Sequence, residues 1–221
     1  YRGLDQNIYQ SDGFTNYTIF SLWDTYRALH PLFNLLQPAR NNDMIKSMLA
    51  HYDQSVHKML PIWSHYANEN WCVIGYHATS VIADALTKKV GDFDARHALK
   101  ASVNTANVSY FDGLGDYLHY GYVPDDKSHS SVSKTLELAY NDWCIAQIAA
   151  ANNDTATKAK FLKRSENYKN VFDKHSGFMR PRLSDGSFRA DFDPLDTHGQ
   201  GFIEGNAWNY GLYVPHQLED M

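Results

Sequence analysis

One acidic residue near the end of the chain stands in a setting that suits proton transfer. Glu204 lies between Gly201 and Gly205, and the apolar residues Phe202 and Ile203 precede it. Apolar neighbours penalise the charged form of a carboxyl group, as a general acid requires near neutral pH, and glycines let a substrate approach closely. Glu204 is therefore a candidate general acid, although the same pattern also fits an acidic residue that caps the next helix.

Two other stretches contain acidic residues that could serve a sugar site. Trp23 directly precedes Asp24 in SLWDTYR, and Arg27 follows one helical turn later. Tryptophan stacks on the apolar face of a sugar ring, and a carboxylate accepts hydrogen bonds from its hydroxyl groups. The alternative here is a capped, salt-bridged helix. Glu137, in VSKTLELAYND, lies near a predicted helix start, where a solvated carboxylate or one that interacts with the helix dipole is the alternative.

The composition favours a globular protein and a carbohydrate cleft. Of the 221 residues, 43% are hydrophobic and 20% are charged, and the formal net charge of −5 argues against a nucleic-acid-binding face. Aromatic residues make up 14% of the chain, and tyrosine and tryptophan beside Asp, Asn and His suit sugar binding. The sequence has no phosphate-loop, dinucleotide-binding, H-E-x-x-H, C-x-x-C or G-x-S-x-G motif, and no apolar run approaches the length of a membrane span.

The scaffold that must position these residues is predicted to be helical. Apolar residues recur at helical spacing in six segments: 16–36, interrupted at Pro31, then 41–59, 76–90, 92–107, 131–152 and 154–177. Gly91 and Gly177 are expected to end helices, and aspartates after Gly91 to begin one. Long loops, 60–75, 109–130 and 178–203, alternate with short ones, which fits antiparallel helical hairpins with the long loops at one end. We therefore predict one all-α domain.

Four other residues have structural interpretations. The aspartates Asp112 and Asp116 lie in a segment rich in glycine and tyrosine that is predicted to be a loop, where turn and cap roles explain most aspartates. Cys72 and Cys144 have apolar, helix-like surroundings, so two buried thiols are expected, and a disulfide stays open.

Several stretches together resemble glycoside hydrolase family 92, the calcium-dependent exo-acting α-mannosidases. The matching runs are DGFTNYTIFSLWDTYRALHPL, GYHATSVIADA, VSKTLELAYNDWCIAQIA, NYKNVFD with GFMRPRLSDGSF, and FDPLDTHGQGFIEGNAWNY. They span nearly all of residues 12–214 in the family's order. Together they are highly specific, although no single short motif carries the resemblance.

The resemblance implies a catalytic domain built as an (α/α)6 barrel of helical hairpins. It implies hydrolysis of terminal α-linked mannose in N-glycans or mannans, with inversion of configuration. By the family's pattern Glu204 is the general acid, Trp23 and Asp24 lie in the subsite for the terminal mannose, and Glu137 and Asn206 are neighbours of the substrate. The family also implies a Ca²⁺ that contacts the mannose hydroxyl groups, and secretion to the periplasm or cell surface.

The sequence departs from the family's pattern after Glu204. The general base, which in inverting glycosidases stands roughly 6.5–9.5 Å from the acid, belongs to a later motif that is absent here, as is the N-terminal β-sandwich domain. We therefore interpret residues 1–221 as one partial catalytic domain of a longer enzyme, dependent on the remainder of the parent polypeptide and inactive alone. The alternatives are another inverting (α/α)6 glycosidase, trehalase-like or glucosidase-like, and a non-catalytic helical module that binds sugars or serves as a scaffold.

Overall fold

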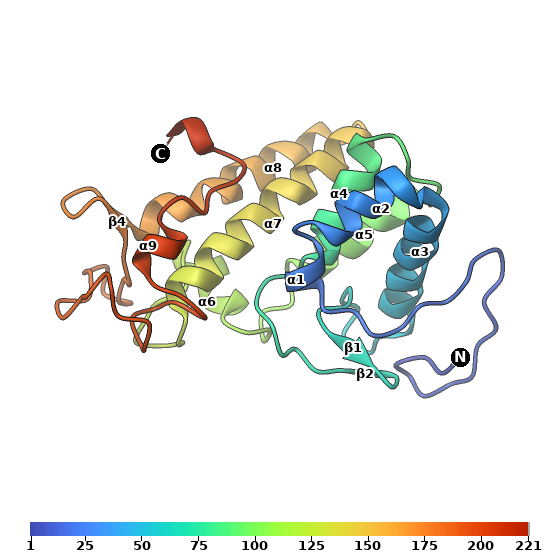
Figure 1. Cartoon of the computed structure of the whole chain (residues 1–221), viewed down its shortest axis with the longest axis horizontal. Coiled ribbons are helices and arrows are strands. Elements are labelled where there is room, and N and C mark those ends of the chain that lie inside the picture. Colours follow the sequence, from blue (N-terminus) through green and yellow to red (C-terminus); the bar gives the residue numbers. More distant parts are fainter. Residues whose placement is uncertain (221) are drawn as a thin grey trace. The chain divides into compact units, whose positions relative to one another are not determined.

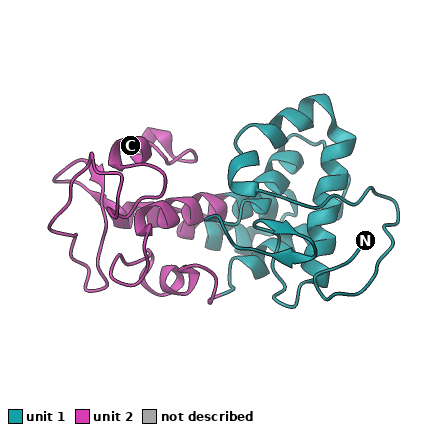
Figure 2. Ribbon diagram, turned by 60° about the horizontal axis from the view of Figure 1, so that its bottom comes forward, with its two compact units in different colours: residues 1–108, 144–161 teal, residues 109–143, 162–221 magenta. Residues whose placement is uncertain are grey.

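The computed structural model describes residues 1–220, and most of its regular structure is helical (Figure 1). The chain divides into two compact units (Figure 2). Unit 1 comprises Tyr1–Val108 and Cys144–Phe161, and unit 2 comprises Ser109–Trp143 and Leu162–Met221. The two units are described separately below. None of the helices formed by residues 1–220 combines the length and apolar character needed to cross a bilayer.

Unit 1 is built on four helices that pack on one another, α2, α3, α4 and α5 (Figure 1). Its elements are α1 (Leu22–Thr25), α2 (Leu29–Leu36), α3 (Pro38–Gln54), α4 (Ala78–Thr87) and α5 (Ala95–Thr105), with a short antiparallel hairpin of β1 (Ser64–His65) and β2 (Asn68–Glu69). The apolar face predicted for 41–59 is buried at Ile45, Met48, Leu49 and Tyr52. Val56 is exposed because α3 already ends at Gln54.

The start of α5 follows the expected capping chemistry, whereas the N-cap side chains of α1, α2, α3 and α4 form no capping hydrogen bond. The side chain of Asp94 accepts hydrogen bonds from the backbone N–H groups of Arg96 and His97, so the predicted aspartate at the start of α5 is confirmed. The predicted stop at Gly91 is wrong, since α4 ends at Thr87, with Lys88 as its C-cap. The predicted interruption at Pro31 is also wrong. Pro31 is the third residue of α2, where a missing backbone N–H costs no helical hydrogen bond.

Helix α2 buries polar side chains and exposes apolar ones, which is the reverse of an ordinary surface helix. Its buried residues are His30 and Asn34, whereas Leu29, Leu32, Leu35 and Leu36 are exposed. A chain of hydrogen bonds satisfies the buried groups: His30 Nδ1 lies 2.7 Å from Asn41 Oδ1, Asn41 Nδ2 donates to Asn34 Oδ1, and Asn34 Nδ2 donates to Asp84 Oδ2. The leucine face of α2 is thus the exposed one.

Unit 2 is organised around the N-terminal part of the long helix α7 (Ser131–Ala151). Its other elements are α6 (Leu114–Tyr120), the end of α8 (Thr155–Ser165), the 3-10 helices η1 (Glu166–Val171) and η2 (Leu218–Asp220), the antiparallel hairpin of β3 (Phe172–Asp173) and β4 (Phe178–Met179), and α9 (Ala207–Tyr210). The prediction for 131–152 is confirmed by α7. The predicted helix to Gly177 is wrong, because η1 and the hairpin replace its second half.

Helix α6 lies inside the segment 109–130 that was predicted to be a loop. Gly113 and Gly121 bracket it with φ angles of +82° and +78°, and these left-handed residues define its two ends. Asp112, just before the helix, contacts the buried Lys134 of α7 at 2.5 Å. The helix is short and rich in glycine and tyrosine, so its sequence carries little helical periodicity.

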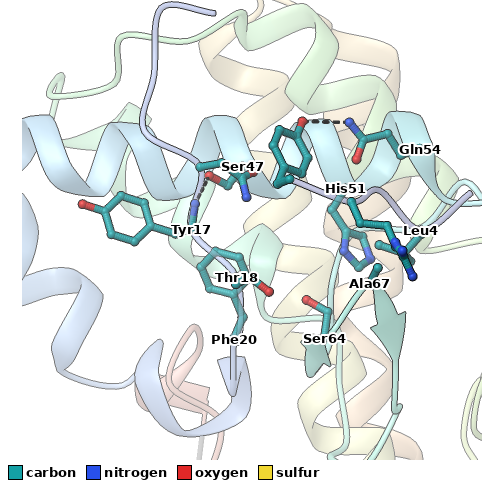
Figure 3. A pocket seen from close by; sticks show the side chains of 12 residues that line it. Leu4, Tyr17, Thr18, Phe20, Ser47, His51, Gln54, Ser64 and Ala67 are labelled. Carbon is teal, nitrogen blue, oxygen red and sulfur yellow. Dashed lines mark hydrogen bonds between the residues drawn. The ribbon is translucent and has the colours of Figure 1, made fainter. Parts of the chain in front are cut away.

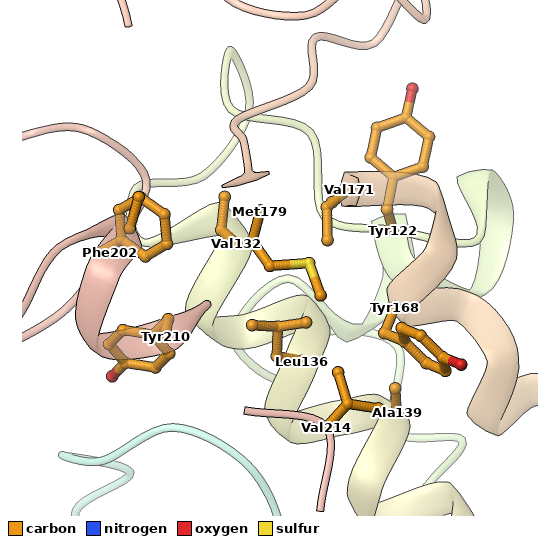
Figure 4. Packing of buried hydrophobic residues seen from close by; sticks show 11 residues of the cluster. Tyr122, Val132, Leu136, Ala139, Tyr168, Val171, Met179, Phe202, Tyr210 and Val214 are labelled. Carbon is orange, nitrogen blue, oxygen red and sulfur yellow. The ribbon is translucent and has the colours of Figure 1, made fainter. Parts of the chain in front are cut away.

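The core of unit 2 forms where the C-terminal segment packs on α7 (Figure 4). Val132, Leu136 and Ala139 supply one side of the cluster from α7. The other members are Tyr122, Tyr168, Val171, Met179, Phe202, Ala207, Tyr210 and Val214. Residues on both flanks of Glu204 therefore belong to the core, which attaches that segment of the chain to α7.

The two cysteines differ in their surroundings. Both are free thiols, Cys144 is buried and Cys72 is exposed. The expectation is confirmed for Cys144 but wrong for Cys72, which lies in the connection between β2 and α4 rather than in a helix.

Buried histidines make unit 1 sensitive to acid. Burial lowers the pKa of His51 to about 3, while an unfolded histidine titrates near 6.5. The unfolded chain therefore binds more protons below about pH 6.5, and the free energy of unfolding should fall as the pH falls from there. Replacing His51 with glutamine should reduce this dependence between pH 6.5 and 5 by up to about 1.4 kcal/mol per pH unit, measured by urea unfolding.

Glu69, beside His51, has the opposite effect on how stability depends on pH. Glu69 lies 3.6 Å from His51 Nε2, and burial raises the pKa of Glu69, so its contribution to stability is lost as the pH rises through the folded-state value. The comparison of His51→Gln with the wild type isolates the contribution of His51, because both proteins keep Glu69. The control, His198→Gln, removes an exposed histidine and should keep the wild-type pH dependence. An unchanged dependence in His51→Gln would contradict the expectation.

Candidate active site

Glu204 lies in an unusual backbone conformation. Its φ angle is +51°, in the left-handed region that costs a residue with a side chain about 1–2 kcal/mol. Its side chain is exposed and forms no hydrogen bond or ion pair with any of residues 1–220. Left-handed backbone in a non-glycine residue persists only where the surrounding structure imposes it, and such positions concentrate at functional sites.

The helix that follows Glu204 has a different cap. Asn206 is the N-cap of α9, and its side chain accepts hydrogen bonds from the N–H groups of Trp208 and Asn209. The Asn209 side chain in turn accepts from the Asn206 N–H at 3.0 Å, which completes a capping box. The alternative interpretation of Glu204 as a helix cap is therefore wrong. The Asn206 amide also donates a hydrogen bond to the Leu195 carbonyl, and its predicted contact with the substrate stays a prediction.

Helix α7 holds the backbone that leads into Glu204. The carbonyl of Gly201 accepts hydrogen bonds from the N–H groups of Val132 and Ser133, at 2.9 and 3.2 Å. The Ile203 N–H donates to Ser133 Oγ at 3.1 Å, and the Ile203 carbonyl accepts from the Tyr210 hydroxyl at 2.8 Å. These polar contacts reach from α7 and α9 to the residues next to Glu204.

Phe202 does not cover Glu204 as its sequence position suggested. The Phe202 ring is buried and lies 5.6 Å from the ring of Tyr210, within the core of unit 2 (Figure 4). The Glu204 side chain, by contrast, is exposed. Phe202 thus anchors the loop in the core, whereas Glu204, two positions later, is exposed to solvent.

Gly201 is required by close packing as well as by its φ angle of +82°. A Cβ atom there would lie 2.7 Å from Pro181 Cγ and 3.0 Å from Val132 Cγ2. Gly199 also has a positive φ, +69°, but its Cβ position is open. We expect Gly201→Ala to lower the free energy of unfolding by about 1–3 kcal/mol more than Gly199→Ala, because only the first adds a clash to the backbone strain. Equal destabilisation in urea unfolding would contradict this.

Glu137 is fully buried, at 0% exposure, on α7. Its Oε2 accepts a hydrogen bond of 2.5 Å from the Tyr213 hydroxyl, which belongs to the segment after α9. The interpretation of Glu137 as a solvated residue is therefore wrong. A buried carboxylate bonded to a tyrosine is a preformed acceptor, and its contact with substrate stays a prediction. Sequence reasoning missed Tyr213, since no spacing rule connects it with a residue 76 positions earlier.

Trp23 and Asp24 lie in unit 1, on the short helix α1. Trp23 is 8% exposed, and the Arg27 guanidinium lies 5.4 Å from its ring centroid while Nε donates to the Trp23 carbonyl. Asp24 is exposed and accepts a hydrogen bond from the Ser21 hydroxyl. Arg27 thus contacts Trp23, whereas the Asp24 carboxylate is bound by Ser21, the N-cap residue of α1. Their roles in binding mannose stay predictions.

Unit 1 also contains a small pocket of about 40 Å³, beneath the N-terminal segment (Figure 3). Leu4, Thr18, Phe20, His51 and Ser64 are among its lining residues. The space accommodates a water molecule or two rather than a sugar ring. Trp23 and Asp24 do not line it. The pocket is therefore separate from the predicted substrate-binding residues.

The described residues do not offer a calcium site of their own. Among residues 1–220, no three or more His, Cys, Asp or Glu side chains come together in a way that could hold a metal ion. Calcium takes six to eight oxygen ligands, usually including carboxylates. The expected Ca²⁺ remains a prediction of the family resemblance.

Glu204 thus stands exposed on an anchored loop of a helical scaffold. Comparison with known proteins identifies the family of the chain. The sequence profile of the glycosyl hydrolase family 92 catalytic domain matches residues 1–221, and the chain belongs to this family. The predicted all-α class is confirmed, and the fold matches the (α/α)6-barrel catalytic domains of family 92.

Solved structures of the family are closely similar. The family 92 α-mannosidase BT3965 from Bacteroides thetaiotaomicron is 52% identical, with a TM-score of 0.93 over 97% of this chain and 29% of that chain. The inverting mannosidase BT2199 from the same organism is 31% identical, with a TM-score of 0.83 over 91% of this chain and 28% of that chain. BT3965 has also been solved with mannoimidazole bound.

A further relative comes from a fungus. An uncharacterized secreted glycosidase from Arthroderma benhamiae is 28% identical over 185 residues, which is 66% of this chain and 24% of the relative. The 221 residues therefore span less than a third of the length of these relatives.

Proposed function

We propose that this chain carries the proton-donating half of the active site of an inverting exo-α-mannosidase. The observation that supports the proposal best is the state of Glu204. It is exposed, lacks a partner among residues 1–220, and keeps a left-handed φ of +51° on a loop anchored to α7. A carboxyl group with no structural role at such a position is available to protonate a leaving group.

The substrate class follows from the relatives. BT3965 is an α-mannosidase with a mannoimidazole complex, and BT2199 is an inverting mannosidase. By this similarity we propose that the parent polypeptide removes terminal α-linked mannose from N-glycans or mannans, with Trp23, Asp24, Glu137 and Asn206 near the substrate. The secreted fungal relative supports a place outside the cytoplasm, in the periplasm or at the cell surface.

We also propose that the general base and the calcium ligands come from other parts of the parent polypeptide. The relatives are more than three times as long as the 221 residues. The exposed leucine face of α2 supports contact with further protein. No step of the reaction is assigned here to the metal.

Two assays test the proposal. Proton NMR of the reaction mixture should show that the parent polypeptide releases β-mannose first from an α-mannoside, because inversion exchanges the anomeric configuration. Release of α-mannose would contradict inversion. The isolated chain 1–221 should show no measurable turnover, since loss of a positioned base lowers the rate by on the order of 10²–10⁴-fold or more.

A further inference from the structure

The peptide group that joins Ile203 to Glu204 is held by a hydrogen bond at its carbonyl oxygen. Its carbonyl oxygen accepts the Tyr210 hydroxyl hydrogen bond at 2.8 Å, and Tyr210 itself is 9% exposed. The φ angle of Glu204 is the rotation about the bond that leaves this peptide plane. The Tyr210 bond therefore holds one of the two groups whose relative rotation defines this torsion.

The preceding peptide group is held as well. The Ile203 N–H donates to Ser133 Oγ at 3.1 Å, and Ser133 is fully buried in the first turns of α7. One residue thus has both its donor and its acceptor bound by side chains from two different helices. On the other flank, the capping box at Asn206 fixes where α9 begins.

We infer that Tyr210 and Ser133 are positioning residues for Glu204, which hold the left-handed backbone that aims its carboxyl group. The inference rests on the proposed role of Glu204 as proton donor. Neither side chain bonds to the Glu204 carboxylate, so each acts through the backbone of Ile203. Loss of either bond releases the strained conformation and leaves the acid misplaced when the leaving group needs its proton.

The core of unit 2 offers a matched control for Tyr210. The Tyr122 hydroxyl also donates to a backbone carbonyl, that of Leu183, at 2.8 Å, and Tyr122 belongs to the same apolar cluster (Figure 4). Replacement by phenylalanine removes one hydrogen bond of the same kind in each case. The two variants should be similarly stable, and only Tyr210→Phe changes the backbone beside the acid.

The test uses the parent polypeptide with two substrates. One is an unactivated α-mannoside, whose alcohol must be protonated on departure, and the other is a dinitrophenyl α-mannoside, whose leaving group departs without a proton. We expect Tyr210→Phe and Ser133→Ala to lower kcat on the first substrate between about 10-fold and 10²-fold, with KM unchanged. On the activated substrate the loss should shrink to less than about threefold. Tyr122→Phe should resemble the wild type on both.

The outcomes separate the inference from the proposed function on which it rests. Equal loss of kcat on both substrates in Tyr210→Phe and Ser133→Ala, or no loss on either, would overturn the inference if Glu204→Gln still shows the leaving-group-dependent loss. If Glu204→Gln itself lost activity equally on both substrates, the proposed role of the acid would fail instead. A Tyr122→Phe variant that matched Tyr210→Phe would show that the effect is structural, which also overturns the inference.

Discussion

Replacing Glu204 with glutamine in the parent polypeptide is expected to lower kcat on an unactivated α-mannoside by about 10²–10⁴-fold. Glutamine keeps the shape of the side chain and cannot donate the proton that the departing alcohol needs. Because Glu204 is exposed and makes no contact with residues 1–220 that the substitution would break, the folded state should be unaffected. Steady-state kinetics and urea unfolding of the same preparation check both parts.

The control for this variant lies close to Glu204 in the sequence, on helix α9. Trp208 is exposed on the adjacent helix, and its backbone N–H, which the substitution leaves intact, makes the capping bond to Asn206. We expect Trp208→Phe to change kcat far less than Glu204→Gln, because no proton transfer is assigned to the indole. If Glu204→Gln left hydrolysis intact, a non-catalytic sugar-binding module would become the better interpretation.

Replacing Asp142 with asparagine should cost about 3–5 kcal/mol of unfolding free energy. Asp142 is 0% exposed, and its two oxygens accept from Arg164 Nη2 at 2.8 Å and Nε at 3.0 Å. The Tyr117 hydroxyl adds a third bond at 2.8 Å. Removal of the negative charge breaks this ion pair and takes the Asp142 counter-charge from a guanidinium whose side chain is only 14% exposed.

A surface ion pair of unit 2 provides the contrast. Arg189 and Asp191 form a similar contact at 2.8 Å, but the Asp191 side chain is 77% exposed. Asp191→Asn should therefore change the unfolding free energy by no more than about 1 kcal/mol. The double variant Asp142→Asn with Arg164→Met should recover part of the loss, since it also removes the buried positive charge that Asp142 neutralises. A loss below about 1 kcal/mol in Asp142→Asn alone would contradict the expectation.

Much of the helical scaffold could be predicted from local sequence. The predictions for α3, α5 and α7 depend on apolar spacing and on cap residues such as Asp94, which act within one or two turns. The incorrect predictions of secondary structure have local causes too. Helix α6 is short and its glycine boundaries resemble a loop, and η1 with the β3–β4 hairpin replaces the end of a helix whose polar sequence allowed either outcome.

The geometry of the candidate site depends on contacts that local sequence does not report. Glu204 could be singled out from its neighbours, but its left-handed φ comes from bonds to Ser133, 70 positions earlier, and to Tyr210. The capping role of Asn206, by contrast, follows a local motif, Asn-x-x-Asn, that can be recognised in the sequence. Glu137 looked solvated because its partner Tyr213 follows 76 positions later.

The central claim is that Glu204 donates the proton to the leaving group. It is tested most directly by kcat for a series of aryl α-mannosides with leaving groups of increasing acidity, measured for the wild-type parent polypeptide and for Glu204→Gln. The account predicts a weak dependence in the wild type and a steep one in the variant, with the two rates converging for the most acidic leaving group. Parallel dependences, with the same fold-loss for every leaving group, would contradict it.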